Sequence, residues 1–242
     1  MKKIEMTKSH HTIHKNNVSY DDFGETFGKS RRDLHWEEID ETLSEFLVHF
    51  SPSTGQLADI GCGNGRLLKH IQMHEYADSV KSIFSTYIGL DTSDVLLDQA
   101  RADISLSDFF VSTNWIQGDM RQMGEELEEY GLFDGIFFIA SFHHLMLREE
   151  RISVLSQAKN LISKTGKIVM INWHLLHPLQ EKYAASITTT YPDGSADFDV
   201  KIGTHKRFYH AFSHEEYISL AEEVGLHVSD QFWERNSIVI WQ

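Results

Sequence analysis

The chain has 242 residues, of which 41% are apolar and 24% are charged, a composition typical of a globular protein with a sizeable core. Its 36 acidic residues outnumber 22 Lys and Arg, and the net charge of -14 disfavours nucleic acid and anionic lipid unless basic residues cluster locally. The single cysteine, Cys62, excludes an internal disulfide and a cysteine-rich zinc site. The longest apolar run, residues 136–140, is too short for a bilayer, and no secretory signal pattern opens the chain, so we expect a cytoplasmic protein.

Two different patterns precede the first predicted strand. Residues 1–19 are polar and predict a flexible arm. Residues 20–50 repeat apolar side chains at spacings of three and four, which predicts a helix with one apolar face. No linker follows, so residues 20–242 are expected to form a single domain.

From about residue 56 to residue 172, predicted strands and helices alternate. The strands cover 56–60, 87–90, 114–117, 133–140 and 167–172, and the helices cover 66–73, 93–101 and 148–162. This alternation predicts parallel strands joined by crossover helices, which is an open α/β sheet.

The alternation stops at residues 174–212, which we interpret as an insertion. In the helix predicted next, over 213–224, Ser213 and Glu216 form a capping-box pattern and Gly225 is a stop signal. Two short strands are predicted to end the chain, at about 226–234 and 237–241.

The strongest motif is Asp59-Ile-Gly-Cys-Gly-Asn-Gly65, between a predicted strand and a predicted helix. Its glycines, Gly61, Gly63 and Gly65, let the backbone turn sharply and approach a ligand closely. Their spacing differs from the dinucleotide pattern, and no Gly-Lys-Ser/Thr follows as in a P-loop. Because Asp59 would repel a pyrophosphate, the motif disfavours a nucleotide bound through its phosphates.

Acidic residues also end the next two predicted strands. Asp91 can accept both hydroxyls of a ribose, as at the switch point of a doubly wound sheet. Asp119 can face an adenine edge, with Met120 beside it for apolar contact. Each acid alone could be an ordinary turn residue. Three acids beside one glycine loop favour a neutral nucleoside that carries a cation.

Taken together, these residues resemble the class I S-adenosylmethionine-dependent methyltransferases over residues 55–172. The resemblance implies a Rossmann-like α/β fold with a seven-stranded, mostly parallel sheet, helices on both faces and an insertion before the last helix and strands. It implies S-adenosylmethionine as cofactor, with the loop glycines around its amino-acid end, Asp91 on the ribose and Asp119 near the adenine. The cofactor-binding residues that we expect are Arg31, Arg32, Asp59, Gly61, Gly63, Gly65, Asp91, Thr92, Asp119, Met120 and Ala140.

Four further patches narrow the resemblance to the tRNA methyltransferases that esterify 5-carboxymethyluridine at the wobble position. They are Phe27 to Trp36, Phe138 to Leu145 with its His-His-Leu, Lys206 to Phe212, and Phe232 to Ile240. Three features depart from the pattern: the arginine is doubled, no proline follows Trp36, and Phe208 replaces a tyrosine.

The acceptor determines which further groups the reaction needs. A carboxylate, with a pKa near about 4, is already ionised at neutral pH and needs a cation to hold it rather than a base. Arg207 is the first candidate for this clamp, and Arg31 or Arg32 the second. A nitrogen or hydroxyl acceptor would need a base, for which His143 or His144 would serve. Tyr209 and His210 share the Arg207 patch and are further candidates, as cleft or core residues.

The residues leave three functions open. The first is the tRNA methyltransferase, with tRNA held by a basic rim formed by the arm and residues 201–207, and with a small zinc-containing activator subunit such as the resembled eukaryotic enzymes use. The second is a small-molecule methyltransferase of the same fold, favoured by the acidity. The third is a cofactor-binding module without catalysis. His174 and His177 have a ligand-like spacing, but neither an acid nor a cysteine accompanies them, so we expect no metal site.

Overall fold

The computed structural model describes residues 39, 40, 43, 47, 54–73, 76–103, 109–202, 205–233 and 236–241, with the backbone alone at 178, 179 and 230–233. The predicted arm over residues 1–19 lies outside these ranges, as do Arg31 and Arg32. Within the predicted helix over residues 20–50, the four described positions are helical. Ile39, Leu43 and Leu47 are buried there, as their apolar spacing predicts.

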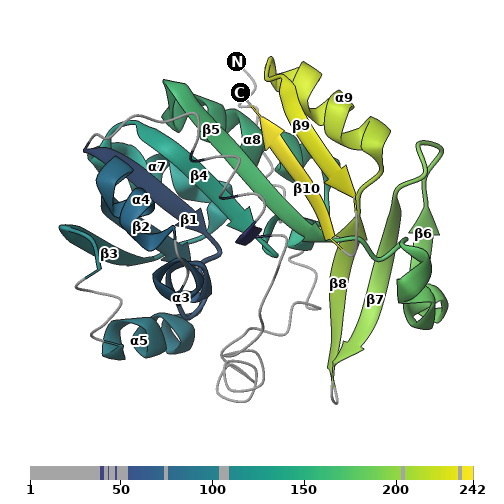
Figure 1. The fold of residues 1–242 in the computed structure, drawn as a ribbon. Helices are drawn as coiled ribbons and strands as arrows, with labels where there is room; N and C mark the ends of the chain where they lie inside the picture. The colour runs from purple at the N-terminus through teal and green to yellow at the C-terminus, as the bar shows by residue number, and fades with distance from the viewer. Residues whose placement is uncertain are drawn as a thin grey trace, which may run out of the picture.

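Seven strands form the main sheet in the order β3-β2-β1-β4-β5-β10-β9 (Figure 1). They are β1 (Gly55–Ile60), β2 (Phe84–Asp91), β3 (Ser112–Gln117), β4 (Phe133–Ile139), β5 (Ile162–Trp173), β9 (Val228–Trp233) and β10 (Asn236–Trp241). Pairs among the first five are parallel, whereas β10 is antiparallel to β5 and β9. The expected mostly parallel sheet is confirmed. Its strand order reverses between β1 and β4, where such sheets bind ligands beyond the carboxyl ends of the strands.

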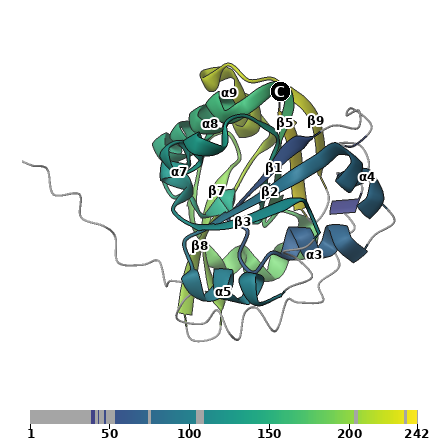
Figure 2. The same cartoon turned by 90° about the vertical axis from the view of Figure 1, so that its left-hand side faces the viewer.

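Helices cover both faces of this sheet (Figure 2). On one face lie α3 (Arg66–Met73), α4 (Ala77–Ile83) and the described part of the N-terminal helix, and on the other lie α7 (Met123–Leu127), α8 (Arg148–Leu161) and α9 (His214–Val224). A further helix, α5 (Asp94–Ala102), connects β2 to β3.

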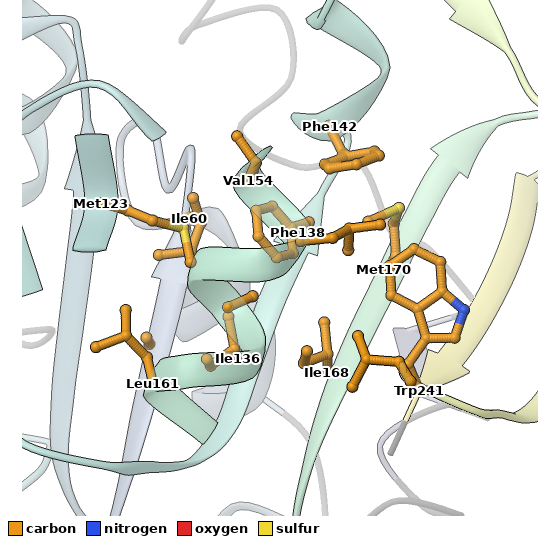
Figure 3. Packing of buried hydrophobic residues seen from close by; sticks show 14 of the residues in the cluster. Ile60, Met123, Ile136, Phe138, Phe142, Val154, Leu161, Ile168, Met170 and Trp241 are labelled. Carbon is orange, nitrogen blue, oxygen red and sulfur yellow. The ribbon is translucent and has the colours of Figure 1, made fainter. Parts of the chain in front are cut away.

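The strand β4 shows how two separate cores arise. Its Ile136 and Phe138 pack with Val154 of α8 in one apolar cluster, as Figure 3 shows. Phe137 and Ile139 belong to the cluster on the opposite face. Because successive strand residues point to opposite faces, a strand covered on both sides is apolar at nearly every position.

The segment that interrupts the alternation forms a second, three-stranded antiparallel sheet. A 3-10 segment, η5 (Pro178–Ser186), precedes its strands β6 (Ile187–Thr190), β7 (Ala196–Ile202) and β8 (His205–Ala211). Apolar residues of one face of this sheet, including Phe198 and Tyr209, form a third cluster with Leu175. Residues 174–212 therefore build a small layer beside the main sheet (Figure 1).

The main differences from the sequence predictions concern short or extended elements. The helix α4 lies between the first two predicted strands, and its two buried residues, Val80 and Ile83, are too few to produce a periodic signal. The strand β5 begins five residues earlier than predicted, at Ile162, and runs through the expected turn at 164–166. Among the described helices, none combines the length and the apolarity required to cross a bilayer.

Candidate active site

The glycine loop after β1 has the close backbone approach that its sequence predicts. Gly61, Gly63 and Gly65 all have positive φ, at 77°, 55° and 76°. A Cβ added to Gly61 would lie 2.3 Å from the Cβ of Ser141, which follows β4. The Gly61 amide donates to the Leu90 carbonyl oxygen at 2.7 Å, which ties the loop to β2. Only glycine fits at position 61, since both the φ and the space exclude a side chain.

At the end of β1, Asp59 is a buried acid with capacity for a further partner. One oxygen, Oδ2, accepts a hydrogen bond from the Tyr87 hydroxyl at 2.6 Å. The other, Oδ1, is buried and has no hydrogen-bond partner within the described part of the chain. Burial is the main cause that raises the pKa of Asp59 to about 7, with a smaller contribution from Asp91. A cationic ligand would supply the missing partner, so the site fits the ammonium group of an amino acid.

Asp91, at the end of β2, organises the same loop. Its Oδ2 accepts from the Gly63 amide and its Oδ1 from the Ser93 amide, both at 2.8 Å. Each carboxylate oxygen has further acceptor capacity, so the group can also take the two hydroxyls expected of a ribose. The expected contact Thr92 follows directly and is exposed.

The residues after β3 form the third side of the cofactor region. Asp119 accepts from Arg121 Nε at 3.0 Å, and Arg121 Nη1 donates to Glu150 of α8 at 3.2 Å. Burial tends to raise the pKa of Asp119, but the bonds from Arg121 outweigh it and hold the pKa below its ordinary value. The Met120 methyl lies 3.7 Å from the Cβ position of Gly61. An ionised acid and an apolar contact therefore lie where an adenine is expected.

The backbone is strained where β4 meets this loop. Ala140 has a φ of 53°, and it is the one non-glycine residue with positive φ among the described positions. The next residue, Ser141, is buried and donates from its Oγ to the Ile60 carbonyl oxygen at 2.5 Å. Such strain is held in place by surrounding structure and is concentrated at functional sites. The turn therefore packs tightly against the glycine loop.

A ring cluster lies beyond this turn, where the second sheet meets the main one. The 3-10 helix η4 (Phe142–His144) carries His143 and His144, whose ring centroids lie 5.0 and 4.8 Å from that of Tyr209 in β8. Trp173, the last residue of β5, stacks on Tyr209 with centroids 5.1 Å apart and planes 7° apart. Three of the five predicted catalytic residues are thus brought together, although they are up to 66 positions apart in sequence.

The hydrogen bonds of the two histidines define different tautomers. The Trp173 amide donates to His143 Nδ1 at 3.3 Å, so the neutral His143 ring carries its proton on Nε2. His144 Nδ1 lies 3.0 Å from the Phe208 carbonyl oxygen, which can only accept, so Nδ1 carries the proton. The neutral His144 ring therefore has its lone pair on Nε2. His144 suits the role of a base, whereas His143 suits that of a donor.

The alternation along β8 separates the other two candidates. Arg207 precedes Tyr209 by two residues, so both side chains project from the same face, and Arg207 is half-buried. His210 projects from the opposite face and is 1% exposed. Its two ring nitrogens each lie 2.6 Å from a carboxylate, that of Asp197 or that of Glu216. The structure therefore does not bring His210 together with His143, His144 and Tyr209.

Four residues of the site were not among the predicted site residues. Tyr87 and Arg121 hold the acids, Ser141 holds the glycine loop, and Trp173 stacks on Tyr209. Trp173 directly follows a predicted strand, which was the available signal. Tyr87 and Ser141 act on β1 from the neighbouring strand β2 and from the end of β4, and Arg121 acts on Asp119 two residues before it, so no motif in the sequence marks them. His174 and His177 lie with ring centroids 5.5 Å apart.

Comparisons with known proteins agree with this geometry. Residues 58–168 match the model of a methyltransferase domain family. A provisionally named methyltransferase of Encephalitozoon cuniculi is 23% identical over 219 residues, which is 90% of each chain. The tRNA (carboxymethyluridine(34)-5-O)-methyltransferase alkbh8 of Xenopus tropicalis is 28% identical over 159 residues, which is 64% of this chain and 20% of that protein.

Solved structures show the same fold at low sequence identity. An S-adenosylmethionine-dependent methyltransferase of Clostridium acetobutylicum aligns with a TM-score of 0.62 at 14% identity, over 92% of this chain and 98% of its own. A Haloferax volcanii protein, solved in complex with the Trm112 methyltransferase activator, aligns with a TM-score of 0.61 at 15% identity, over 92% and 96%.

Residues 58–168 thus match a methyltransferase domain, and the main sheet has the Rossmann-like class I fold of the solved S-adenosylmethionine-dependent methyltransferases. The predicted cofactor, S-adenosylmethionine, is bound in one solved structure of the same fold, the amino pentose methyltransferase CalS10 of Micromonospora echinaspora, which is 15% identical and aligns with a TM-score of 0.57. The sequence similarity to the Xenopus tRNA enzyme covers 64% of the chain and bears on the identity of the methyl acceptor.

Proposed function

We propose that this methyltransferase esterifies the carboxylate of a 5-carboxymethyluridine-type nucleoside at the wobble position of tRNA. The observation that carries the proposal is the contact between two of the sequence patches that suggested this acceptor. His144, in the His-His-Leu patch, donates to the carbonyl of Phe208, in the Arg207 patch, at 3.0 Å. The partial similarity to the Xenopus enzyme adds support.

The cofactor-binding residues in this proposal are the predicted ones. S-adenosylmethionine, when bound, supplies a methyl group on a sulfonium that an in-line nucleophile can displace. Asp59 holds the ammonium group, Asp91 the ribose hydroxyls, and Asp119 the adenine amino group. The glycine loop and Ala140 bring the backbone close enough to exclude water from the sulfonium.

On the acceptor side, this chain has to orient a carboxylate that is already charged. Arg207 is the clamp, because a guanidinium can hold both carboxylate oxygens at once. Tyr209 and Trp173 form a flat wall against which a uracil ring can pack. His143, with its proton on Nε2, can donate to an acceptor oxygen. No base is required, and orientation supplies much of the rate enhancement.

Methyl labelling tests the proposal directly. The purified chain is incubated with methyl-labelled S-adenosylmethionine and with tRNA whose wobble carboxymethyluridine is unesterified, then treated with mild alkali. We expect label in tRNA that alkali releases as methanol. Asp91→Ala, which removes the ribose contact, is the negative control. Alkali-stable label, or label confined to small metabolites, would contradict the ester.

A small-molecule acceptor is the alternative, and the lone pair of His144 on Nε2 favours it. This nitrogen could accept the proton of a hydroxyl or amine, a role that the carboxylate reaction does not require. The net charge of -14 also suits a small acceptor better than tRNA. Label in a metabolite extract that His144→Gln abolishes would establish this second function.

The proposed partners follow from the same acceptor. We propose that tRNA contacts a basic rim that includes Lys201 and Lys206, which are paired across β7 and β8. The Haloferax protein was solved with the Trm112 activator, and we propose that a subunit of this kind activates the present chain in the cytoplasm. If the chain binds S-adenosylhomocysteine but labels no tRNA, addition of such a subunit should restore labelling. Continued inactivity would overturn the tRNA acceptor.

A further inference from the structure

A cluster of buried charges lies on the face of the second sheet opposite Tyr209. His210 of β8 and Asp197 of β7 are directly paired across the two strands, and His210 Nδ1 lies 2.6 Å from Asp197 Oδ1. His210 Nε2 lies 2.6 Å from Glu216 Oε2 of α9. Arg151 of α8 contributes a fourth charge, with Nη1 3.4 Å from Glu216 Oε1.

Hydrogen-bond geometry fixes the charge of this cluster. Both ring nitrogens of His210 face carboxylate oxygens, which only accept, so the ring satisfies both as an imidazolium. Two carboxylates then face two cations, and the cluster is neutral. The exposed fractions of His210, Glu216 and Arg151 are 1%, 4% and 3%, so water contributes little to the balance. The Tyr191 hydroxyl donates to the other oxygen of Asp197 at 2.7 Å.

The cluster joins the second sheet to the helical layer of the main domain. Asp197 and His210 belong to the sheet, whereas Glu216 and Arg151 belong to α9 and α8. Buried ion clusters add little net stability, because desolvation offsets most of their attraction. Their bonds are short and directional, however, and they fix the distance and orientation of the elements that they connect.

We propose that this ion cluster positions β8 for the acceptor reaction, with His210 as its central positioning residue. The inference rests on the proposed roles of Arg207 and Tyr209, which project from the other face of the same strand. It also uses Phe208, whose carbonyl accepts from His144. A shift of β8 therefore moves the clamp, the aromatic wall and a histidine of the turn together.

The variant His210→Gln tests the inference, because both N–H donors of an amide are on one nitrogen, whereas Asp197 and Glu216 face two different ring nitrogens of His210. We expect kcat/KM for the tRNA acceptor to fall about 10-fold to 100-fold, as small displacements of positioning groups do. The affinity for S-adenosylhomocysteine, measured by calorimetry, should stay within about twofold, because no cofactor residue belongs to the cluster. Adding Asp197→Asn, whose amide can donate to the side-chain carbonyl of the introduced glutamine, should recover part of the loss.

His70→Gln is the matched control, since it makes the same substitution in another histidine–aspartate pair. His70 Nε2 lies 2.7 Å from Asp40, on the opposite side of the sheet. We expect a comparable drop in melting temperature and an unchanged kcat/KM. If His210→Gln lowers the melting temperature and also leaves kcat/KM unchanged, the cluster merely stabilises the fold and the inference is overturned.

A measurement without acceptor separates this inference from the proposed function. The ring NMR signals of His143 and His144, assigned through their single Gln variants, report on their contacts with β8. We expect both signals to shift in His210→Gln and to stay in place in His70→Gln. If the wild type does not methylate tRNA but His210→Gln still shifts both signals, the proposed acceptor is refuted and the positioning role stands. Unshifted signals would refute the positioning role itself.

Discussion

The loops after β1 to β4 and the second sheet meet at the ring cluster, yet they are constructed differently. In the loops, backbone groups make the decisive contacts: the Gly61 amide bonds to β2, and the Gly63 and Ser93 amides bond to Asp91. In the second sheet, side chains make them, through stacked rings on one face and buried charges on the other. A cofactor of constant shape suits the first construction. An acceptor that differs between enzymes suits the second, since side chains can change without altering the loop backbone.

This comparison predicts that substitutions in the loops and in the second sheet impair different functions. Damage to the loops should remove cofactor binding, and with it every activity. Damage to the second sheet should leave cofactor binding intact and impair the acceptor alone. The following variants test this separation, beginning with the largest expected effect.

Gly61→Ala should abolish cofactor binding. The added Cβ would lie 2.3 Å from Ser141 Cβ, and φ at this residue is 77°. The loop would have to move away from β4, so we expect the affinity for S-adenosylhomocysteine to fall more than about 100-fold by calorimetry.

Gly131→Ala is the matched control for this substitution. Its φ is 81°, but nothing lies within 4 Å of the added Cβ. With its ψ of -141°, this residue lies outside the left-handed helical region, so the substitution should cost about 1–3 kcal/mol of unfolding free energy from backbone strain and leave the cofactor affinity unchanged. Equal losses of affinity in the two variants would show that strain, rather than close approach, governs the loop.

The same contrast explains what the sequence could predict. The glycine loop, Asp59, Asp91 and Asp119 each occupy a strand end, so strand prediction alone places them at one edge of the sheet. Ser93 and Ser213 cap their predicted helices, accepting from the Leu96 and Glu216 amides. These relations are local, and a short stretch of sequence contains all the partners.

The acceptor side depends on contacts between distant residues. His144 meets Phe208, and Trp173 meets Tyr209, only after β7 and β8 have paired. The strands of the second sheet could not be predicted from alternating apolar and polar residues. All four residues of β6 are exposed, and most residues of β7 are buried, so neither strand alternates between buried and exposed positions. His210 illustrates the consequence: its patch suggested a site residue, but strand alternation turns it toward Glu216.

Substitution of Arg207 should weaken binding of the acceptor and leave cofactor binding unchanged. Arg207→Lys keeps the charge but loses two-point contact with a carboxylate, so we expect KM for the tRNA acceptor to rise about tenfold, and further in Arg207→Ala. The affinity for S-adenosylhomocysteine should not change. The exposed Lys164, which lies near the opposite end of β5 from Trp173, is the control: Lys164→Ala should change KM by less than about twofold at physiological salt. If the lysine control raised KM as much as substitution of Arg207 does, the role of Arg207 would be general electrostatic attraction of tRNA instead of a specific contact with the carboxylate.

Protonation of Asp59 should affect the cofactor side alone. Because its pKa is about 7 in the folded chain, the carboxylate needed for the ammonium group is lost as pH falls below 7. We expect the affinity for S-adenosylmethionine to decrease about fivefold between pH 7 and pH 6, and proton release on binding to be measurable by calorimetry in two buffers. Asp59→Asn should bind more weakly and without this pH dependence.

The same pKa has the opposite effect on the stability of the ligand-free chain. The folded state binds the proton of Asp59 more tightly than the unfolded state, whose pKa is near 3.8. The contribution of Asp59 to the unfolding free energy therefore falls as pH rises from about 4 to about 7 and then levels off. Thermal unfolding of wild type and Asp59→Asn across this range should converge near pH 4. A constant difference would indicate that Asp59 is ionised throughout.

The two capping serines give the smallest and most closely matched test. Ser93→Ala and Ser213→Ala each remove one side-chain acceptor from a helix start, and each should cost about 1 kcal/mol of unfolding free energy. Ser93 begins α5 beside Asp91, so its loss should weaken S-adenosylhomocysteine binding by a few fold. Ser213 begins α9, which carries Glu216, so its loss should lower kcat/KM for the acceptor by a few fold instead. The two variants should lose equal stability, so a difference in function cannot come from stability. If Ser93→Ala weakens only cofactor binding and Ser213→Ala impairs only the acceptor reaction, then the loops position the cofactor and the second sheet with α9 positions the acceptor.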